Sequence, residues 1–414
     1  MKILWFSNGI ISKESSKGSG SWLHAMRDLL AIEVELINIT KGASGDIENH
    51  VGNGVKEYIL PSWPLYDGVP SAENINKIAS IINDEKPDII HIWGVEQYWA
   101  VLFCRGYLSH RNVLLEIQGV VSSCATVFWG GLSLEDIKKC KSFREIVFPR
   151  KEGSLMWNNR EFLNGGKREI DIIRGFQRIA TQSDWTRNQI LPFISDGTKL
   201  YNSLRPLRNN FLVSRKWERH LHKSPRLFTS ISYYLPLKGL HVLFIALSIL
   251  KKEYPGIKLY VAGPDLYSIQ WYKINGYQKF LINLIEDNNL QENIIFTGRL
   301  DADGLIEQLL ESDIFVNSSF VESYSASLAE ALCLGVPCVC SYAGAMPEFS
   351  KINEVAVYYT PYDFCTCAES IRSLFIDERK CELLSVNAIS HISEICGREA
   401  VLKRQLETYN NIVG

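Results

Sequence analysis

Two glutamates with seven residues between them flank a serine-rich turn. At this turn a strand expected over 314–317 leads into a helix expected over 325–333. The first N–H groups of a helix have no partner within the helix and carry partial positive charge. The turn is therefore a ready site for a diphosphate. The residues with this chemistry are Glu322, Glu330, Ser323, Ser325 and Ser327.

The two glutamates can serve different parts of one ligand. Glu322, at the tip of the turn, can accept hydrogen bonds from sugar hydroxyls. Glu330, about two helical turns further on, can hold a ribose diol. The alternative is an ordinary acidic N-cap followed by an exposed helical glutamate, because two glutamates eight positions apart are common by chance.

The wider pattern resembles a known family. Glu-x7-Glu followed by Ala-Leu-Cys-Leu-Gly-Val-Pro-Cys-Val is similar to the signature of the family 4 retaining glycosyltransferases, which have the GT-B fold. Further segments resemble motifs of that family in the right order: 235–239 (LPLKG), 260–264 (YVAGP), 295–298 (IFTG) and 337–348, the strand and turn after the signature helix.

The resemblance implies roles for the remaining donor-site residues. Lys238 would hold the donor diphosphate and, with the N–H groups of the signature helix, stabilise the negative charge of the leaving nucleoside diphosphate. The alternative for Lys238 is a solvated lysine ahead of a helix. The other donor contacts implied are Tyr324, Gly263, Pro264, Thr297, Gly298 and Gly20. No GxGxxG follows the first strand, which argues against a dinucleotide-dependent dehydrogenase.

The chain departs from the family pattern at three places. Tyr233 stands where many relatives have an arginine for the diphosphate, and Gln118 stands where many have a histidine. Ser323-Tyr324-Ser325 replaces the usual glycine-aromatic-glycine. Arg299, at a strand end expected to face the cleft, is a candidate for the missing cation; the alternative is a surface arginine.

The first half of the chain offers candidate acceptor contacts at or near strand ends. They are His91, Trp93, Glu96 and Gln118. For His91, which lies inside an apolar strand, the alternative is a histidine buried in the core.

Strands and helices alternate twice along the 414 residues, which predicts two Rossmann-like domains facing across a cleft. The first domain is expected over 1–203, joined by a C-terminal helix at about 395–414. The polar stretch 204–223 is expected to connect it to a nucleotide-sugar-binding domain over 224–394.

Composition excludes several other classes of protein. The formal charge of −2 gives no bias toward nucleic acid, and no apolar run is long enough to span a bilayer. The ten cysteines have no zinc-like spacing, which predicts reduced thiols, no metal site and a cytoplasmic protein. Residues 138–178 carry 11 Lys and Arg against five acids, interleaved with aromatics. This stretch predicts either peripheral membrane contact or a solvated helical face.

Together these features predict a metal-independent retaining glycosyltransferase with no cofactor. It would move a sugar from a UDP- or GDP-linked donor to a glycan or lipid-linked acceptor, with a role in polysaccharide biosynthesis. Two alternatives remain: a nucleotide-sugar epimerase of the same shape and a catalytically silent nucleotide-sugar-binding module.

Overall fold

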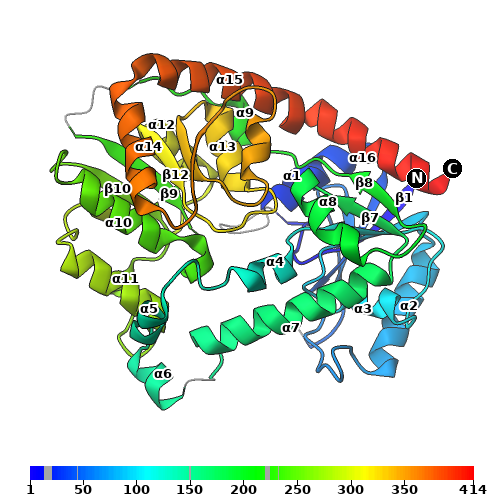
Figure 1. Ribbon diagram of the computed structural model, residues 1–414. Coiled ribbons are helices and arrows are strands. Elements are labelled where there is room, and N and C mark those ends of the chain that lie inside the picture. Colours follow the sequence, from blue (N-terminus) through cyan, green and yellow to red (C-terminus); the bar gives the residue numbers. More distant parts are fainter. Residues whose placement is uncertain (14–20, 44, 149–150, 220–223, 232) are drawn as a thin grey trace.

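The computed structural model describes residues 1–13, 21–43, 45–148, 151–219, 224–231 and 233–414. They form two β-sheets, each interleaved with helices, that lie next to each other in one molecule (Figure 1). The predicted α/β fold with two Rossmann-like domains is confirmed.

The first sheet has the order β3-β4-β2-β1-β5-β6-β7-β8 and is parallel apart from the β3–β4 hairpin. Asn53 and Gly54 form the hairpin turn, with φ angles of 51° and 73° that match the twist of paired strands. The strands are β1 (Lys2–Phe6), β2 (Glu35–Lys41), β3 (Glu48–Gly52), β4 (Val55–Leu60), β5 (Ile89–Trp93), β6 (Val113–Ile117), β7 (Arg178–Thr181) and β8 (Lys199–Asn202).

The helices of this half begin with α1, whose first turn faces the other domain. They are α1 (Ser21–Leu30), α2 (Ala72–Glu85), α3 (Trp99–Cys104), α4 (Val121–Thr126), α5 (Leu134–Lys139), α6 (Phe143–Val147), α7 (Leu155–Arg174) and α8 (Asp184–Ile190), with the short turn η1 (Leu191–Phe193). The central strands are buried on both faces, as the continuous apolar runs of a parallel sheet require.

The second sheet has the order β11-β10-β9-β12-β13-β14, and all its pairs are parallel. Its strands are β9 (Arg226–Ser230), β10 (Lys258–Ala262), β11 (Ile294–Phe296), β12 (Ile314–Asn317), β13 (Cys338–Ser341) and β14 (Val357–Tyr359). Its helices are α9 (Asn209–Val213), α10 (Leu240–Leu250), α11 (Gly276–Asp287), α12 (Ala302–Leu310), α13 (Ala326–Leu334), α14 (Phe364–Ile376) and α15 (Glu378–Cys396), with the short turns η2 (Pro236–Lys238), η3 (Leu266–Ser268) and η4 (Met346–Ser350).

The last helix returns to the first domain. Helix α16 (Arg398–Val413) continues from α15 along the edge of the molecule that both domains share (Figure 1). The Tyr409 hydroxyl lies 3.1 Å from Trp5 Nε1 and 2.9 Å from His91 Nδ1, deep under the first sheet. These contacts tie the C-terminal helix to strands at the beginning of the chain.

A second crossing runs in the opposite direction. Residues 121–148 and 151–154, which contain α4, α5 and α6 and are called the arm here, reach from the first domain onto the second. Phe128 and Cys140 are buried in the core of the second domain, and the His241 ring lies 3.0 Å from the Gly130 carbonyl oxygen. The arm therefore packs as part of the second domain although the chain order places it in the first.

Candidate active site

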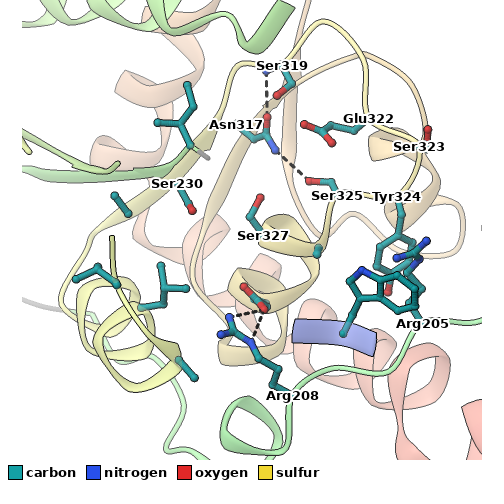
Figure 2. A pocket seen from close by; sticks show the side chains of 18 of the residues that line it. Arg205, Arg208, Ser230, Asn317, Ser319, Glu322, Ser323, Tyr324, Ser325 and Ser327 are labelled. Atoms are coloured by element: carbon teal, nitrogen blue, oxygen red, sulfur yellow. Dashed lines mark hydrogen bonds and ion pairs between the residues drawn. The ribbon is translucent and has the colours of Figure 1, made fainter. Parts of the chain in front are cut away.

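A cavity of about 1050 Å³ lies between the two domains. Part of its wall is drawn in Figure 2. The first domain contributes Trp22, Gln118, Gly119, Cys124 and Gln182, among others, and the second contributes the loop and helix that follow β12. The predicted residues that line it are Lys238, Arg299, Glu322, Ser323, Tyr324, Ser325, Ser327, Glu330 and Gln118.

The loop after β12 presents the start of α13 to the cavity. Ser325 takes a left-handed conformation with φ of 67°, which is uncommon for a residue other than glycine. Asn317 holds it there: its side-chain amide donates to Ser325 Oγ at 3.0 Å, and its side-chain oxygen accepts from Ser319 N at 3.0 Å (Figure 2). The side chain of the N-cap residue Ser325 makes no capping hydrogen bond to the first turn of α13. The helix start therefore offers N–H groups and its positive end to an anion.

Lys238 and Glu322 form an ion pair at the same cavity, with Nζ 2.7 Å from Oε1. Burial lowers the pKa of the Lys238 ammonium, but the negative charge of the nearby Glu322 carboxylate opposes this, and the net shift is upward. Lys238 is therefore a permanent cation at neutral pH. Tyr233 lies with its ring 5.6 Å from Lys238 Nζ, so it orients the ammonium without adding a second charge.

The turn that carries Lys238 packs tightly against the loop after β12. Gly239 has φ of 68°, and a Cβ at this position would lie 1.9 Å from the Ser318 carbonyl oxygen. Phe320 N donates to the Leu237 carbonyl at 2.8 Å, and Ser318 Oγ donates to the Lys238 carbonyl at 3.2 Å. This close approach places Lys238 beside the signature loop, and only glycine fits at position 239.

Glu330 is oriented by a partner that the sequence did not single out. Arg208 donates to Glu330 Oε1 through Nε at 3.0 Å and Nη2 at 2.6 Å (Figure 2). Burial raises the pKa of the Glu330 carboxyl, while Arg208 opposes the shift. Both contacts use Oε1, and no hydrogen bond from the described residues reaches Oε2. Glu330 Oε2 is thus available to a ligand in the cavity.

Ser323 connects the loop after β12 to the first domain. Val120 N donates to Ser323 Oγ at 3.2 Å, and the Ser323 carbonyl accepts from Ser183 Oγ at 2.8 Å and Thr186 Oγ1 at 3.3 Å. The peptide carbonyl of the loop is therefore fixed by α8 and the serine before it. Ser323 therefore holds the loop after β12 against the first domain.

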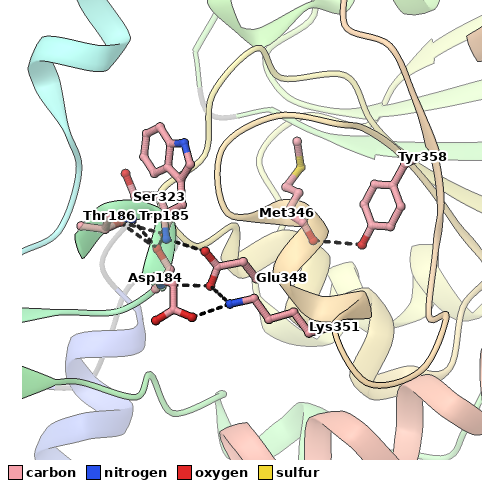
Figure 3. Close-up of polar contacts among 9 residues, drawn as sticks. Asp184, Trp185, Thr186, Ser323, Met346, Glu348, Lys351 and Tyr358 are labelled. Carbon is pink, nitrogen blue, oxygen red and sulfur yellow. Dashed lines mark hydrogen bonds and ion pairs between the residues drawn. The ribbon is translucent and has the colours of Figure 1, made fainter. Parts of the chain in front are cut away.

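A second contact beside it closes the same side of the cleft. The Glu348 carboxylate, from η4, accepts from the backbone N–H groups of Asp184 and Trp185 at the start of α8 (Figure 3). Lys351 pairs with Asp184 and, at 3.3 Å, with Glu348. An acid at a helix N-terminus is favourable, so the second domain caps a helix of the first.

Tyr324 and Arg299 complete the predicted set at the cavity. Tyr324 packs its ring against Phe349, 5.6 Å between centroids, and its hydroxyl lies 2.8 Å from Cys396 Sγ. Burial raises the pKa of the Tyr324 hydroxyl, which stays protonated. Arg299 is exposed at the cavity wall after β11.

Two acceptor predictions are wrong in this structure. His91 and Trp93 are 0% and 1% exposed, packed face to face with 4.0 Å between ring centroids. His91 bonds to Tyr409 of α16, and burial lowers its pKa, so the imidazole is neutral. The alternative of a core histidine holds. Neither ring reaches the cavity.

The remaining predicted residues lie near the strand ends without lining the cavity. Glu96 is exposed in the loop after β5. Thr297 bonds through its hydroxyl to backbone carbonyls at 3.3 and 3.4 Å. Gly263, Pro264 and Gly298 belong to turns after β10 and β11. Gly20 lies outside the described residues.

The cavity residues that the sequence analysis did not single out include two arginines that follow β8. Arg205 stacks on Trp22, 3.9 Å from its ring centroid, and its Nε and Nη2 have no hydrogen-bond partner among the described residues. Arg208 binds Glu330, as above. The polar stretch 204–223 was predicted to connect the two domains. Its two arginines, Arg205 and Arg208, were the sequence feature that could have indicated a binding site there.

Three further observations bear on the predicted class. No group of three or more His, Cys, Asp or Glu side chains in the described ranges is arranged to hold a metal ion. Each of the ten cysteines is a free thiol. Within the same ranges, every helix is too short or too polar to cross a bilayer.

The chain is similar in sequence to known glycosyltransferases. Residues 214–391 match the family model for glycosyl transferases group 1. N-acetyl-alpha-D-glucosaminyl L-malate synthase of Bacillus anthracis is 22% identical over 363 residues, which is 87% of this chain and 83% of that protein. Sulfoquinovosyl transferase of Arabidopsis thaliana is 27% identical over 119 residues, which is 28% of this chain and 23% of that protein.

Solved structures of glycosyltransferases share the whole arrangement. Sucrose-phosphate synthase from Thermosynechococcus elongatus superposes with a TM-score of 0.72 at 16% identity, covering 99% of this chain and 98% of that one. Anabaena HepE in complex with UDP-glucose superposes with a TM-score of 0.67 at 15% identity, covering 99% and 100%. The fold is GT-B, and residues 214–391 match the family model for glycosyl transferases group 1.

Proposed function

We propose that the protein is a retaining glycosyltransferase that moves a sugar from a UDP- or GDP-linked donor to a glycan or lipid-linked acceptor. The observation that carries this proposal is the convergence of Lys238, Glu322 and the uncapped start of α13 on one interdomain cavity. One solved structure that shares the fold, Anabaena HepE, is in complex with UDP-glucose.

The donor diphosphate is assigned to the start of α13, beside Lys238. The ammonium and the N–H groups of the first turn meet the charge that develops on the leaving nucleoside diphosphate. Glu330 Oε2 accepts from the ribose hydroxyls, with Arg208 holding the other carboxylate oxygen. When the donor diphosphate binds Lys238 in place of Glu322, the Glu322 carboxylate accepts hydrogen bonds from sugar hydroxyls.

The transfer is assigned to the front face of the sugar. The bond between the anomeric carbon and the phosphate oxygen breaks, the acceptor oxygen bonds to the same face, and the acceptor proton passes to the departing phosphate oxygen. A double displacement needs a carboxylate on the opposite face. Among the described residues of the first domain, the carboxylate that lines the cavity is Asp28, and Arg27 Nε donates to it at 2.8 Å. Because this carboxylate is already paired with an arginine, we propose the front-face transfer and not a double displacement.

The reaction needs no metal or cofactor in this proposal, because Lys238 and the helix start supply the positive charge. A role in polysaccharide biosynthesis on the cytoplasmic side of a membrane fits a glycan or lipid-linked acceptor. Gln118 and Gly119 line the cavity from the first domain and are the assigned acceptor contacts.

A thermal-shift screen with UDP-glucose, UDP-N-acetylglucosamine and GDP-mannose identifies the donor, since a ligand selective for the folded state raises its stability. With that donor, Lys238→Ala and Glu322→Ala are each expected to lower turnover by orders of magnitude. Near-wild-type rates in both variants would refute the assigned roles. Altered free sugar without an acceptor would indicate an epimerase, and binding without turnover would indicate a silent binding module.

A further inference from the structure

Helix α6 exposes its apolar side chains and buries its carboxylate, which is the reverse of a normal surface helix. Its apolar residues face solvent: Phe143, Ile146 and Val147 are 64%, 63% and 51% exposed, and Phe148, which follows, is 56% exposed. Its one carboxylate is buried instead. Glu145 accepts from Ser142 N at 3.1 Å and Leu155 N at 2.8 Å. The exposed apolar face is therefore built in, because the helix is anchored by its polar side.

The second domain extends this apolar surface. Trp271 and Tyr272, in the segment between η3 and α11, are 69% and 49% exposed, and the Trp271 ring lies 6.1 Å from the Phe143 ring. The contact is fixed by backbone packing beneath it: a Cβ on Gly276 would lie 2.1 Å from the Cys140 carbonyl oxygen. The α6 patch is defined here as these exposed side chains of both domains: Phe143, Ile146, Val147, Phe148, Trp271 and Tyr272.

Cations surround the α6 patch on both domains. Lys151 Nζ lies 5.5 Å from the Phe148 ring, and Lys273 Nζ lies 5.7 Å from the Tyr272 ring. Lys279 Nζ reaches the Lys141 carbonyl at 3.4 Å, so these two lysines also border it. The exposed acids among the described residues of the arm are Glu135 and Glu152. The surface around the α6 patch therefore carries more positive than negative charge.

We propose that the α6 patch inserts into the surface of a membrane rich in anionic phospholipid. Exposed aromatic and aliphatic side chains ringed by lysines are the composition that buries itself at the boundary of headgroups and acyl chains. A second copy of the chain is a poorer occupant. A two-fold interface places each surface against the same surface of the other copy. The lysines around the patch would then face the same lysines of the second copy, and their positive charges would repel.

The position of the patch also bears on the acceptor, and this step rests on the proposed function. The arm that carries α6 begins with α4, whose Cys124 lines the interdomain cavity. In Figure 1, α6 lies at the far end of the arm from α4. A patch seated in the membrane would hold this arm between the lipid surface and the cleft, which suits an acceptor presented on a lipid.

Vesicle flotation tests the surface directly. The probes are vesicles of phosphatidylcholine alone and of equal parts phosphatidylcholine and phosphatidylglycerol, at low and high salt. Phe143→Ser combined with Trp271→Ser removes the two aromatics that meet across the domains. The matched control is Ile376→Ser combined with Val386→Ser, because these side chains are 71% and 66% exposed on α14 and α15, away from the patch.

We expect the wild type and the control to float with the anionic vesicles, less so at high salt, and the patch variant to lose about tenfold or more of this binding. Equal binding by patch variant and control, or no binding by the wild type, overturns the proposal. Self-association that the patch variant abolishes would assign the surface to a second copy instead. UDP and GDP titrations of the same proteins keep the two proposals separate: failure to bind nucleotide refutes the proposed function and leaves the lipid result standing.

Discussion

Replacing Gly130 with alanine tests whether the arm holds Lys238, the lysine that we assign to the donor diphosphate, in place. Gly130 has φ of 57°, and an added Cβ would lie 2.2 Å from the carbonyl oxygen of Pro236. Pro236 begins η2, the short turn that ends at Lys238. Ordinary van der Waals contact begins near 3.4 Å, so the two backbones would have to separate by about 1 Å.

The expected cost has two parts. A side chain in the left-handed region costs about 1–2 kcal/mol, and forcing an extra methyl into a packed interface costs about 1–3 kcal/mol more. The sum is a loss of about 2–5 kcal/mol in the free energy of unfolding. A shift of η2 also moves Lys238 away from Glu322, now 2.7 Å distant, and a displacement of about 1 Å can lower turnover about 100-fold.

Gly153→Ala is the matched control. Gly153 lies on the same arm with φ of 83°, and no atom lies within 4 Å of a Cβ added there. It should lose only the backbone part, about 1–2 kcal/mol, and keep nucleotide binding. Urea denaturation and calorimetric titration with UDP and GDP measure both effects. Equal losses of stability in the two variants, with wild-type nucleotide affinity in each, would refute the role given to the arm.

Three further perturbations have defined outcomes. Ser325→Ala should be less stable than Ser325→Gly by about 1–2 kcal/mol in urea denaturation, because both lose the bond to Asn317 and only alanine keeps the left-handed strain; equal stabilities would contradict this. Burial, opposed by hydrogen bonds from α4, raises the pKa of the Glu169 carboxyl from its ordinary 4.5 to about 7. The folded state then holds that proton more tightly than the unfolded chain, so stability falls by about 3 kcal/mol as pH rises from 4.5 to 7; Glu169→Gln should flatten this slope, and an unchanged slope in denaturation at pH 5 and 8 would exclude the assignment. Arg208→Ala should lower stability by about 3 kcal/mol, because it leaves the Glu330 carboxylate buried without its partner, and should weaken UDP or GDP binding in calorimetry; full affinity would remove the arginine from the donor site.

Much of the fold could be predicted from local pattern. Apolar runs such as 89–93 and 113–117 are the strands β5 and β6 at those residues. Their two-fold alternation with helices predicted two Rossmann-like domains, because a parallel sheet requires a crossover helix between strands. The serine-rich loop that contains Glu322 was predicted to follow the carboxyl end of a strand in the second sheet, where ligands of such sheets bind.

The elements that local pattern missed are those whose partners lie far along the chain. Part of the arm belongs to the basic, aromatic stretch 138–178 of the sequence, yet Gly130 and Phe128 of the arm pack on the second domain. The contacts of Gly130 with Pro236 and His241 span more than 100 positions of the chain, so no periodicity within the arm could reveal them. The inverted orientation of α6 has the same origin, since Glu145 is buried by Leu155 and α11.

The amino-acid sequence by itself determined the two-domain α/β architecture and the chemistry available at the mouth of α13, because both follow from short-range spacing of residues. Only the tertiary structure decided which of those residues meet. It paired Lys238 with Glu322 across 84 positions and Arg208 with Glu330 across 122. It also removed His91 from the candidate site, because α16 returns from 318 positions away and covers that ring with Tyr409. A side chain's role depends on which distant surface buries or faces it, and that is set by packing of the whole chain.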